Sequence, residues 1–160
     1  MNSMTFLLPG GWATLIQEGG ALTRLVWNGP SLPDTPTPLL REAGRQLAAY
    51  FSGSLRRFTL PLAPKGTPFQ TRVWRLLGEI PYGETRAYGE IAAALGRPSA
   101  ARAVGGACHA NPLPLLIPCH RVTAKGGPGG YAPGPEMKIA LLALEKRGGA
   151  VPADETETKP

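Results

Sequence analysis

The chain of 160 residues is poor in the residues on which several protein classes depend. Its two cysteines are too few for a disulfide framework, so we expect a reducing compartment, the cytoplasm. No apolar run approaches the roughly 18 residues needed to cross a bilayer, which argues against a membrane protein. No basic segment precedes Phe6-Leu7-Leu8, and Pro9-Gly10-Gly11 interrupts it, so we expect no secretory signal.

Acidic residues are also scarce, and the charges are unevenly distributed. The chain has 11 acidic and 17 basic residues, which gives a formal net charge of +6. Residues 65–150 hold eleven Lys or Arg and five acids, whereas residues 1–64 hold five Arg and three acids. A basic C-terminal part favours a polyanionic partner, with nucleic acid as the first candidate, although many basic proteins bind none.

Glycine and proline, in contrast, are abundant at 21 and 18 residues, which indicates short elements and frequent turns. In the first third, short apolar or β-branched segments predict strands over Thr5–Leu8, Trp12–Gln17 and Ala21–Trp27, and another over 58–62. A helical apolar face from Leu40 to Phe51 lies between them. Residues 1–62 therefore predict a small α/β (α+β) unit, and it holds no His or Cys for catalysis.

The pattern becomes helical in residues 63–150, which we predict as a second domain. Thr67-Pro68-Phe69-Gln70 is a capping box with Pro at the first helical position, and that helix should run to Ile80. Thr85 is expected to cap a second helix that Gly96 ends, and Ser99 a third that runs to about Ala110. The last helix spans Gly134 to Gly148, and residues 151–160 are predicted to be disordered.

The second and third of these helices, joined by a short turn, have the layout of a helix-turn-helix. The third is unusually rich in small residues, with Ala101, Gly105 and Gly106 among them. Glycine inside a helix costs about 1 kcal/mol relative to alanine, so something must approach this backbone closely. Tight helix packing would also use small residues, but the basic domain and Arg102 favour a DNA groove.

A cysteine–histidine pair ends the proline-rich segment between the third and last helices. A buried cysteine is normally inert, but Cys119 is followed by His120 and Arg121, a base and a positive charge of the kinds that activate a thiol. On a regular strand Cys119 and His120 would point to opposite faces, so their contact requires a turn at Pro118 or an intervening water. Glu145, on the apolar face of the last helix, is a candidate to orient His120.

A metal site is the alternative for the same residues. Cys108-His109 and Cys119-His120 supply two Cys and two His, the correct number of zinc ligands. Neither pair has the spacing of zinc ligands, because adjacent side chains seldom reach one ion. We therefore expect no metal.

These residues also carry a family resemblance. Ile117-Pro118-Cys119-His120-Arg121-Val122, preceded by Asn111-Pro112, resembles the active-site motif of the O6-alkylguanine-DNA alkyltransferases. The resemblance extends over residues 66–147 through G-T-P-F-Q-x-x-V-W, I-P-Y-G-E-T-x-x-Y-G-E-I-A, A-A-R-A-V-G-G-A and L-L-A-L-E, in the family's order. The N-terminal third matches only in layout; in the family it is a ribonuclease-H-like α/β domain of mainly structural role.

The resemblance implies a DNA-repair activity that uses each molecule once. Cys119 would accept the alkyl group irreversibly from O6 of guanine, with His120 as the base through a water and Glu145 holding His120. Asn111 would help organise the site, and Tyr88 would help rotate the target base out of the duplex and donate to its N3. No cofactor is implied, because the nucleophile is consumed.

The resemblance also implies how DNA is bound. Binding would be through the minor groove, with Arg102 filling the space left by the flipped nucleotide. The implied DNA-binding residues are Tyr88, Ala101, Arg102, Gly105, Gly106 and Arg121. The implied alkyl pocket is lined by Pro114, Gly130, Tyr131 and Ala132. The partner would be double-stranded DNA that carries O6-alkylguanine, and the protein is expected to be a monomer without membrane contact.

Two other functions stay open at this point. A lesion sensor would flip the alkylated base and recruit other repair proteins without transfer, but relatives of that kind lack the cysteine that stands here at position 119. A helix-turn-helix regulator with an inert buried Cys119 would prefer one undamaged DNA sequence.

Overall fold

The computed structural model describes residues 1–148, which fall into two compact units. The first unit contains Met1–Pro64 together with the end of the last helix from Arg147, and the second contains Lys65–Lys146. The segment that we predict to be disordered, residues 151–160, lies outside the described residues.

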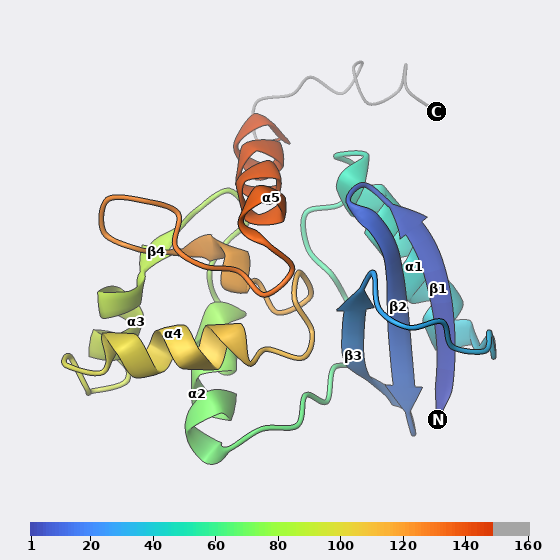
Figure 1. The fold of residues 1–160 in the computed structure, drawn as a ribbon, viewed down its shortest axis with the longest axis horizontal. Helices are drawn as coiled ribbons and strands as arrows, with labels where there is room; N and C mark the ends of the chain where they lie inside the picture. Colours follow the sequence, from blue (N-terminus) through green and yellow to red (C-terminus); the bar gives the residue numbers. More distant parts are fainter. Residues whose placement is uncertain (149–160) are drawn as a thin grey trace. The chain divides into compact units, whose positions relative to one another are not determined.

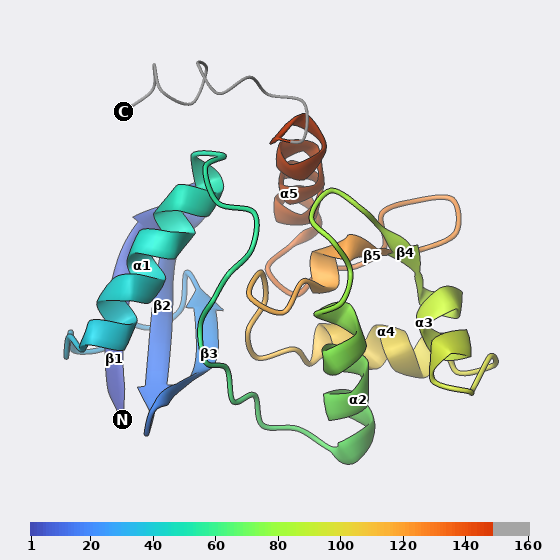
Figure 2. The ribbon, with the colours of Figure 1, turned by 180° about the vertical axis from the view of Figure 1, so that it is seen from behind.

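The first unit is a three-stranded antiparallel sheet covered on one face by a helix (Figures 1 and 2). The strands β1 (Asn2–Leu8), β2 (Gly11–Glu18) and β3 (Ala21–Trp27) pair in chain order, and α1 (Pro38–Phe51) follows. The predicted three strands and helix are confirmed; β3 has the predicted bounds, and the ends of the others differ by at most three residues. The core between sheet and helix consists of fully buried side chains, Leu15, Leu22, Leu40, Leu47 and Tyr50.

The predicted fourth strand over residues 58–62 is wrong. This segment pairs with the sheet through one isolated bridge, between Leu62 and Leu22 of β3. Leu22 donates its N–H to the carbonyl of Pro61 and accepts from the N–H of Ala63. Pro61 has no N–H to donate, so the ladder cannot extend back along the segment toward residue 58.

The second unit is mainly helical. Its elements are α2 (Pro68–Leu77), β4 (Arg86–Ala87), α3 (Tyr88–Ala94), α4 (Ala101–His109), β5 (Val122–Thr123) and α5 (Pro135–Gly148), whose last residues belong to the first unit. Both α2 and α3 pack against α4 (Figures 1 and 2). The indole of Trp74 on α2 donates to the carbonyl of Ala107 at 2.9 Å, which anchors the C-terminal half of α4. The α3–α4 pair forms the predicted helix-turn-helix.

One of the three predicted helix caps is present in the structure. The Thr67–Gln70 capping box is present as predicted. Thr85 and Ser99 do not cap helices: the N-cap residues are Ala87 and Ala100, neither of which has a side-chain cap. In α3 the Glu90 carboxylate accepts the N–H of the N-cap residue Ala87 at 2.8 Å, which is the return bond of a capping box.

The end of α2 also differs from the prediction. The helix ends at Leu77, with Gly78 as its C-cap, instead of running to Ile80. Ile80 is nevertheless buried, as its place in the apolar pattern indicates.

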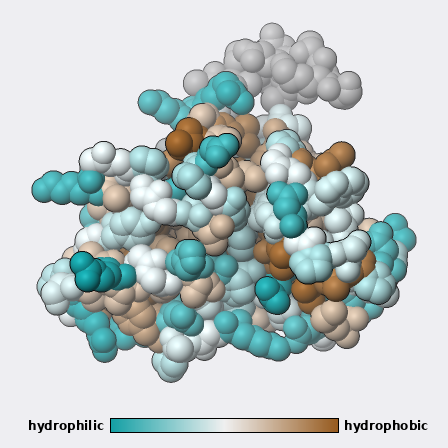
Figure 3. Space-filling model, in the orientation of Figure 1, coloured by the Kyte–Doolittle hydropathy of each residue, from teal (hydrophilic) through white to brown (hydrophobic). Residues whose placement is uncertain are grey.

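The face of the molecule in Figure 3 combines hydrophilic residues with small hydrophobic patches. Among the described residues, the large apolar side chains that are exposed to solvent are Met1, Leu7, Trp12 and Ile139. Among the described helices, none combines the length and apolar character that a membrane crossing requires.

Candidate active site

A short parallel pairing of β4 with β5 builds the site. Arg86 pairs with Val122, and Ala87 with Thr123. The pairing places Tyr88, which starts α3 directly after β4, close to the segment that precedes β5. That segment, Cys119–Arg121, is a 3₁₀ turn introduced by Pro118 and not the strand whose geometry would separate Cys119 from His120. The structure therefore supplies the turn at Pro118 that the sequence left as one of two options.

Asn111 holds the cysteine. Its side-chain amide donates to the Cys119 Sγ at 3.1 Å and to the carbonyl of Ile117 at 2.8 Å, and its Oδ1 accepts the N–H of Leu113 at 2.9 Å. These three bonds fix which end of the amide faces the sulfur, because only the nitrogen can donate. The buried thiol is therefore held by a donor, the kind of group that stabilises a thiolate.

His120 is buried and bound on one side only. Its Nε2 lies 2.7 Å from Glu145 Oε2. An ionised carboxylate can only accept, so Nε2 carries the proton and Nδ1 presents its lone pair. Within residues 1–148, Nδ1 is buried and has no hydrogen-bond partner, and no direct hydrogen bond joins it to Cys119. His120 is therefore oriented by Glu145, and the lone pair of its Nδ1 is available to accept a proton.

Arg121 holds the carboxylate of Glu145. Its Nε and Nη2 donate to Oε1 and Oε2 of Glu145 at 2.9 and 3.0 Å, and its Nη1 donates to the carbonyl of Ile80 at 2.8 Å. The N–H of Gly83 adds a further bond to Oε1 at 3.2 Å. The predicted DNA-binding role of Arg121 is therefore corrected: the side chain is buried, and its guanidinium is occupied inside the protein.

The resting charges follow from burial and these partners. Burial raises the pKa of Cys119 to about 11, against the opposing effects of the Asn111 hydrogen bond and the charge of Lys138. Burial lowers the pKa of His120 in spite of its bond to Glu145. For Glu145, burial favours the neutral acid, but hydrogen bonds from His120 and Arg121 outweigh it and lower the pKa to about 2. At neutral pH the site thus holds a thiol, a neutral imidazole and a carboxylate.

Tyr88 and a glycine-containing loop lie beside the site. Gly129 has φ of +82°, and a Cβ at this position would lie 2.8 Å from the Tyr88 hydroxyl, so both conformation and space require glycine. The His120 and Tyr131 rings lie edge to face with centroids 6.2 Å apart. Of the predicted alkyl-pocket residues, Pro114 and Tyr131 are buried whereas Gly130 and Ala132 are exposed.

The two glycines of α4 are not explained by packing within the protein. A Cβ on Gly106 would meet nothing within 4 Å, and one on Gly105 would meet only the Tyr88 ring at 3.9 Å, an ordinary contact. Arg102 is exposed on the same helix, and Ala101 is partly exposed. Tight helix packing, the alternative for these glycines, therefore does not account for them.

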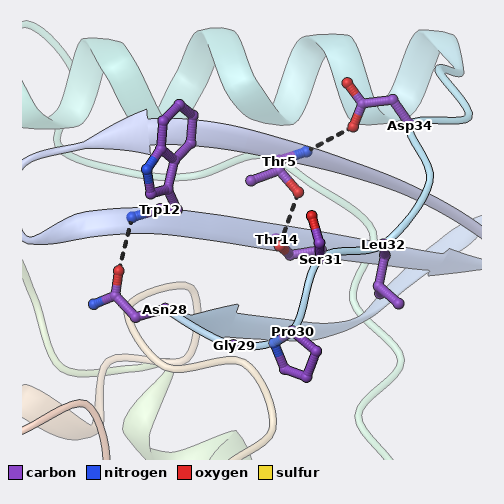
Figure 4. A pocket seen from close by; sticks show the side chains of 9 residues that line it. All are labelled: Thr5, Trp12, Thr14, Asn28, Gly29, Pro30, Ser31, Leu32 and Asp34. Carbon is purple, nitrogen blue, oxygen red and sulfur yellow. Dashed lines mark hydrogen bonds between the residues drawn. The ribbon is translucent and has the colours of Figure 1, made fainter.

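The other candidate sites in the described residues lack a nucleophile with a base beside it. Within residues 1–148, no group of three or more His, Cys, Asp and Glu could hold a metal, and His109 is exposed at the end of α4. A hollow in the first unit is lined by Trp12, Asn28, Asp34 and the hydroxyls of Thr5 and Thr14 (Figure 4). Its lining contains no thiol and no imidazole.

Lys138 is a buried residue that the sequence analysis missed. It is completely buried on α5, and its Nζ donates to the carbonyls of Val122 at 2.6 Å and Gly130 at 3.0 Å. The sequence contains a signal for it, since Lys138, Leu141 and Glu145 are spaced by three and four residues and share one face of the helix.

Fold and site together define a helix-turn-helix protein with a buried cysteine beside a His–Glu–Arg relay. Residues 68–147 match the family model of the 6-O-methylguanine DNA methyltransferase, DNA binding domain. A methylated-DNA–protein-cysteine methyltransferase of Methanosarcina acetivorans is 58% identical over 106 residues, 66% of this chain and 68% of the relative. The Mycobacterium bovis protein of that name is 47% identical over 155 residues, 92% of this chain and 93% of the relative.

A crystal structure described as Mycobacterium tuberculosis OGT in complex with DNA superimposes with a TM-score of 0.85 at 46% identity, and the match covers 98% of each chain. The chain belongs to the O6-methylguanine DNA methyltransferase family.

Proposed function

We propose that this protein repairs DNA by moving an alkyl group, methyl in the simplest case, from O6 of guanine to Cys119. The observation that carries the proposal is the arrangement at one turn: a thiol held by Asn111 next to a histidine whose Nε2 is bound to Glu145 and whose Nδ1 is unpartnered within the described residues. This is the donor and base arrangement that an activated nucleophile needs. The family membership supports the same chemistry.

The transfer balances without a cofactor. A water between Sγ and Nδ1 carries the thiol proton of Cys119 to His120, and Glu145 stabilises the imidazolium that results. The thiolate then attacks the methyl carbon: the S–C bond forms, the C–O6 bond breaks, and its electron pair goes to the guanine, which takes up a proton. The S–C bond of the thioether at Cys119 is not broken again, so the thiol is not regenerated and each molecule acts once.

Delivery of the base depends on α3 and α4. The O6 of a stacked guanine is out of reach of a buried thiol, so the nucleotide has to leave the duplex. Gly105 and Gly106 allow α4 to approach the minor groove, and the exposed Arg102 fills the space left in the stack. Tyr88, at the start of α3, helps rotate the base and donates to its N3. The pocket for the alkyl group is formed by Pro114, Gly130, Tyr131 and Ala132.

The two predicted domains have different roles. Residues 1–62 form a structural domain and residues 63–150 carry DNA binding and chemistry. The protein acts as a monomer on double-stranded DNA. Both Cys108 and Cys119 are free thiols, which supports a reducing setting such as the cytoplasm.

The test is incubation with a duplex oligonucleotide that contains one O6-methylguanine, followed by peptide mass mapping. We expect one methyl group on Cys119, no transfer by Cys119→Ser, and normal transfer by Cys108→Ala. Methylation of Cys108 in place of Cys119 would contradict the assignment. Tight binding with the methyl group still on the guanine would instead identify a lesion sensor, and preference for one undamaged sequence would identify a regulator.

A further inference from the structure

The hollow of the first unit lies on the face of the sheet that α1 does not cover (Figure 4). The ring of Phe6 on β1 packs against Gly44 of α1. Because successive side chains of a strand alternate, its neighbour Thr5 points to the other face, where Thr14 of β2 lies opposite it. The hollow has a volume of about 590 Å³, which is the size of a ligand site.

The loop between β3 and α1 forms the rim of this hollow and is fixed at both ends. At one end Asn28, with φ of +51°, accepts the N–H of Trp12 at 3.0 Å and donates to the carbonyl of Gly10 at 3.2 Å. At the other end Thr35 donates its N–H to the carbonyl of Ser3 at 2.7 Å, and its hydroxyl accepts the Ser3 N–H at 2.8 Å. The hollow is therefore preformed, so a ligand that fills it pays little to order the loop.

Asp34 is the one ionisable side chain in the lining of the hollow. Its Oδ1 accepts the N–H of Thr5 at 3.2 Å. Among the described residues, no basic side chain pairs with this carboxylate. An ionised carboxylate can accept several more hydrogen bonds than this one. The charge of the hollow therefore favours a cationic ligand.

An exposed apolar pair adjoins the hollow. Trp12 is 55% exposed, and Leu7, directly opposite it on β1, is 66% exposed. Ser3 and Thr5 direct their N–H groups away from β2, so Leu7, the next residue in this alternation, does the same. Within residues 1–148, nothing binds the outward main chain of Leu7. An open strand edge beside apolar side chains is suited to an extended polypeptide.

The spacing of the anchoring groups fits an arginine side chain. Two residues along a strand separate Trp12 from Thr14 by roughly 7 Å. The Asp34 carboxylate is bound at Thr5, the residue that pairs with Thr14. The apolar stem of an arginine can therefore pack on the indole while its guanidinium reaches the carboxylate. Arginine suits this place better than lysine, because a guanidinium both stacks on an aromatic ring and pairs with a carboxylate.

We propose that the hollow and the Leu7–Trp12 pair form a docking surface for an extended segment of a partner protein, in which an arginine stands next to an apolar residue. The guanidinium pairs with Asp34, its stem lies on Trp12, and the apolar neighbour packs on Leu7. The proposal does not depend on the proposed function, because no residue of this surface belongs to the Cys119 site.

The test is a titration of the ¹⁵N-labelled full chain, followed by NMR, with an acetylated and amidated peptide that has one arginine and one leucine between glycines. We expect a Kd on the order of 1 mM for so small a contact. The shifts should concentrate at the Trp12 indole and the amides of Ser31 and Asp34. The same peptide with citrulline, the neutral isostere of arginine, should bind about fivefold more weakly, since it loses the ion pair and the cation–π contact.

Matched variants locate the effect on the protein. Asp34→Asn keeps an acceptor for the Thr5 N–H but removes the charge, so it should bind the two peptides equally. Trp12→Ser should weaken the binding of both. Glu79→Gln removes an exposed carboxylate in the second unit and should leave both affinities unchanged. The contrast between the peptides uses the unaltered chain, so it holds even if a variant fails to fold.

Equal affinity of the unaltered chain for the arginine and citrulline peptides would overturn the proposal, as would shifts that lie in the second unit. Agmatine carries the guanidinium and its stem without the leucine or a peptide backbone. If agmatine binds as tightly as the arginine peptide, the hollow is a site for small cations and not for a protein segment. A failure of the proposed function would leave this titration unchanged and show instead as an unmodified Cys119 after incubation with O6-methylguanine DNA.

Discussion

Glu145 Oε2 lies 2.7 Å from His120 Nε2, and this contact determines which nitrogen of the imidazole can act as a base. Because the carboxylate accepts the Nε2 proton, Nδ1 keeps its lone pair, and the same Glu145 is held by two nitrogens of Arg121. The relay therefore extends to an arginine that the sequence analysis had assigned to DNA.

Glu145→Gln should destabilise the protein by roughly 3–5 kcal/mol, because it leaves Arg121 buried without its anion. The folded pKa of Glu145, about 2, is below its ordinary value of 4.5. A depressed pKa stabilises the fold above pH 4.5, and this contribution disappears as the pH falls toward 2. The difference in unfolding free energy between the parent and Glu145→Gln should therefore shrink over that window in urea titrations.

The exposed Glu136 provides the control for this variant, since it lies in the first turn of the same helix. Glu136→Gln should cost less than about 1 kcal/mol. Equal losses for the two variants would show that Glu145 has no special place in the structure.

The rate of methyl transfer should stay constant as the pH falls from 8 to 6.5. The base works in its neutral form, and burial lowers the pKa of His120 below its ordinary 6.5, so protonation begins only at lower pH. Single-turnover rates at saturating duplex DNA measure this profile. A fall in rate centred above pH 6.5 would contradict it.

Asn111→Ala should slow transfer and destabilise the fold. The variant removes the donor to Cys119 Sγ, a bond worth roughly 1.5–3 kcal/mol to a charged partner, which corresponds to a loss of at least about tenfold in rate. It also leaves the N–H of Leu113 without its partner, at about 1–3 kcal/mol, whereas the carbonyl of Ile117 keeps the hydrogen bond from the Cys119 N–H.

Asn111→Asp gives a sharper comparison, because it keeps the acceptor for Leu113 but replaces the donor to the sulfur with a carboxylate. Its transfer rate should be lower than that of Asn111→Ala, because a carboxylate beside the sulfur opposes formation of the thiolate. Transfer as fast as in the parent would exclude Asn111 from activation of the thiol.

Arg102→Ala should weaken repair of duplex DNA far more than reaction with a free base such as O6-benzylguanine. The side chain is exposed on α4, and its proposed place in the base stack matters only when a duplex has to be opened. Single-turnover rates with the two substrates measure the contrast. Equal losses on both would rule out the intercalating role.

Gly106→Ala should raise stability and lower DNA affinity at the same time. A Cβ at this position meets nothing in the protein, and alanine favours a helix by about 1 kcal/mol over glycine. Urea unfolding and fluorescence anisotropy with a labelled duplex measure the two effects. An alanine variant that binds DNA as tightly as the parent would show that this glycine does not serve the groove.

Local patterns were sufficient wherever the interaction itself was local. The capping box at Thr67 joins residues three apart, and the three strands of the first unit alternate with glycine pairs that mark their turns. Thr85 and Ser99 failed as caps because several residues near a helix start can compete for the N-cap position, which here is taken by Ala87 and Ala100. The strand over 58–62 failed because Pro61 removes a donor that a ladder requires.

The sequence by itself predicted which residues carry the chemistry, since Cys119, His120, Asn111 and Glu145 lie in motifs with recognisable order and spacing. Tertiary structure decided what their neighbours do. The guanidinium of Arg121 binds Glu145 inside the protein instead of facing DNA. The ammonium of Lys138 donates to the carbonyls of Val122 and Gly130. The physical reason is that the cost of a buried charge depends on partners far along the chain, and only the fold brings those partners within hydrogen-bond distance.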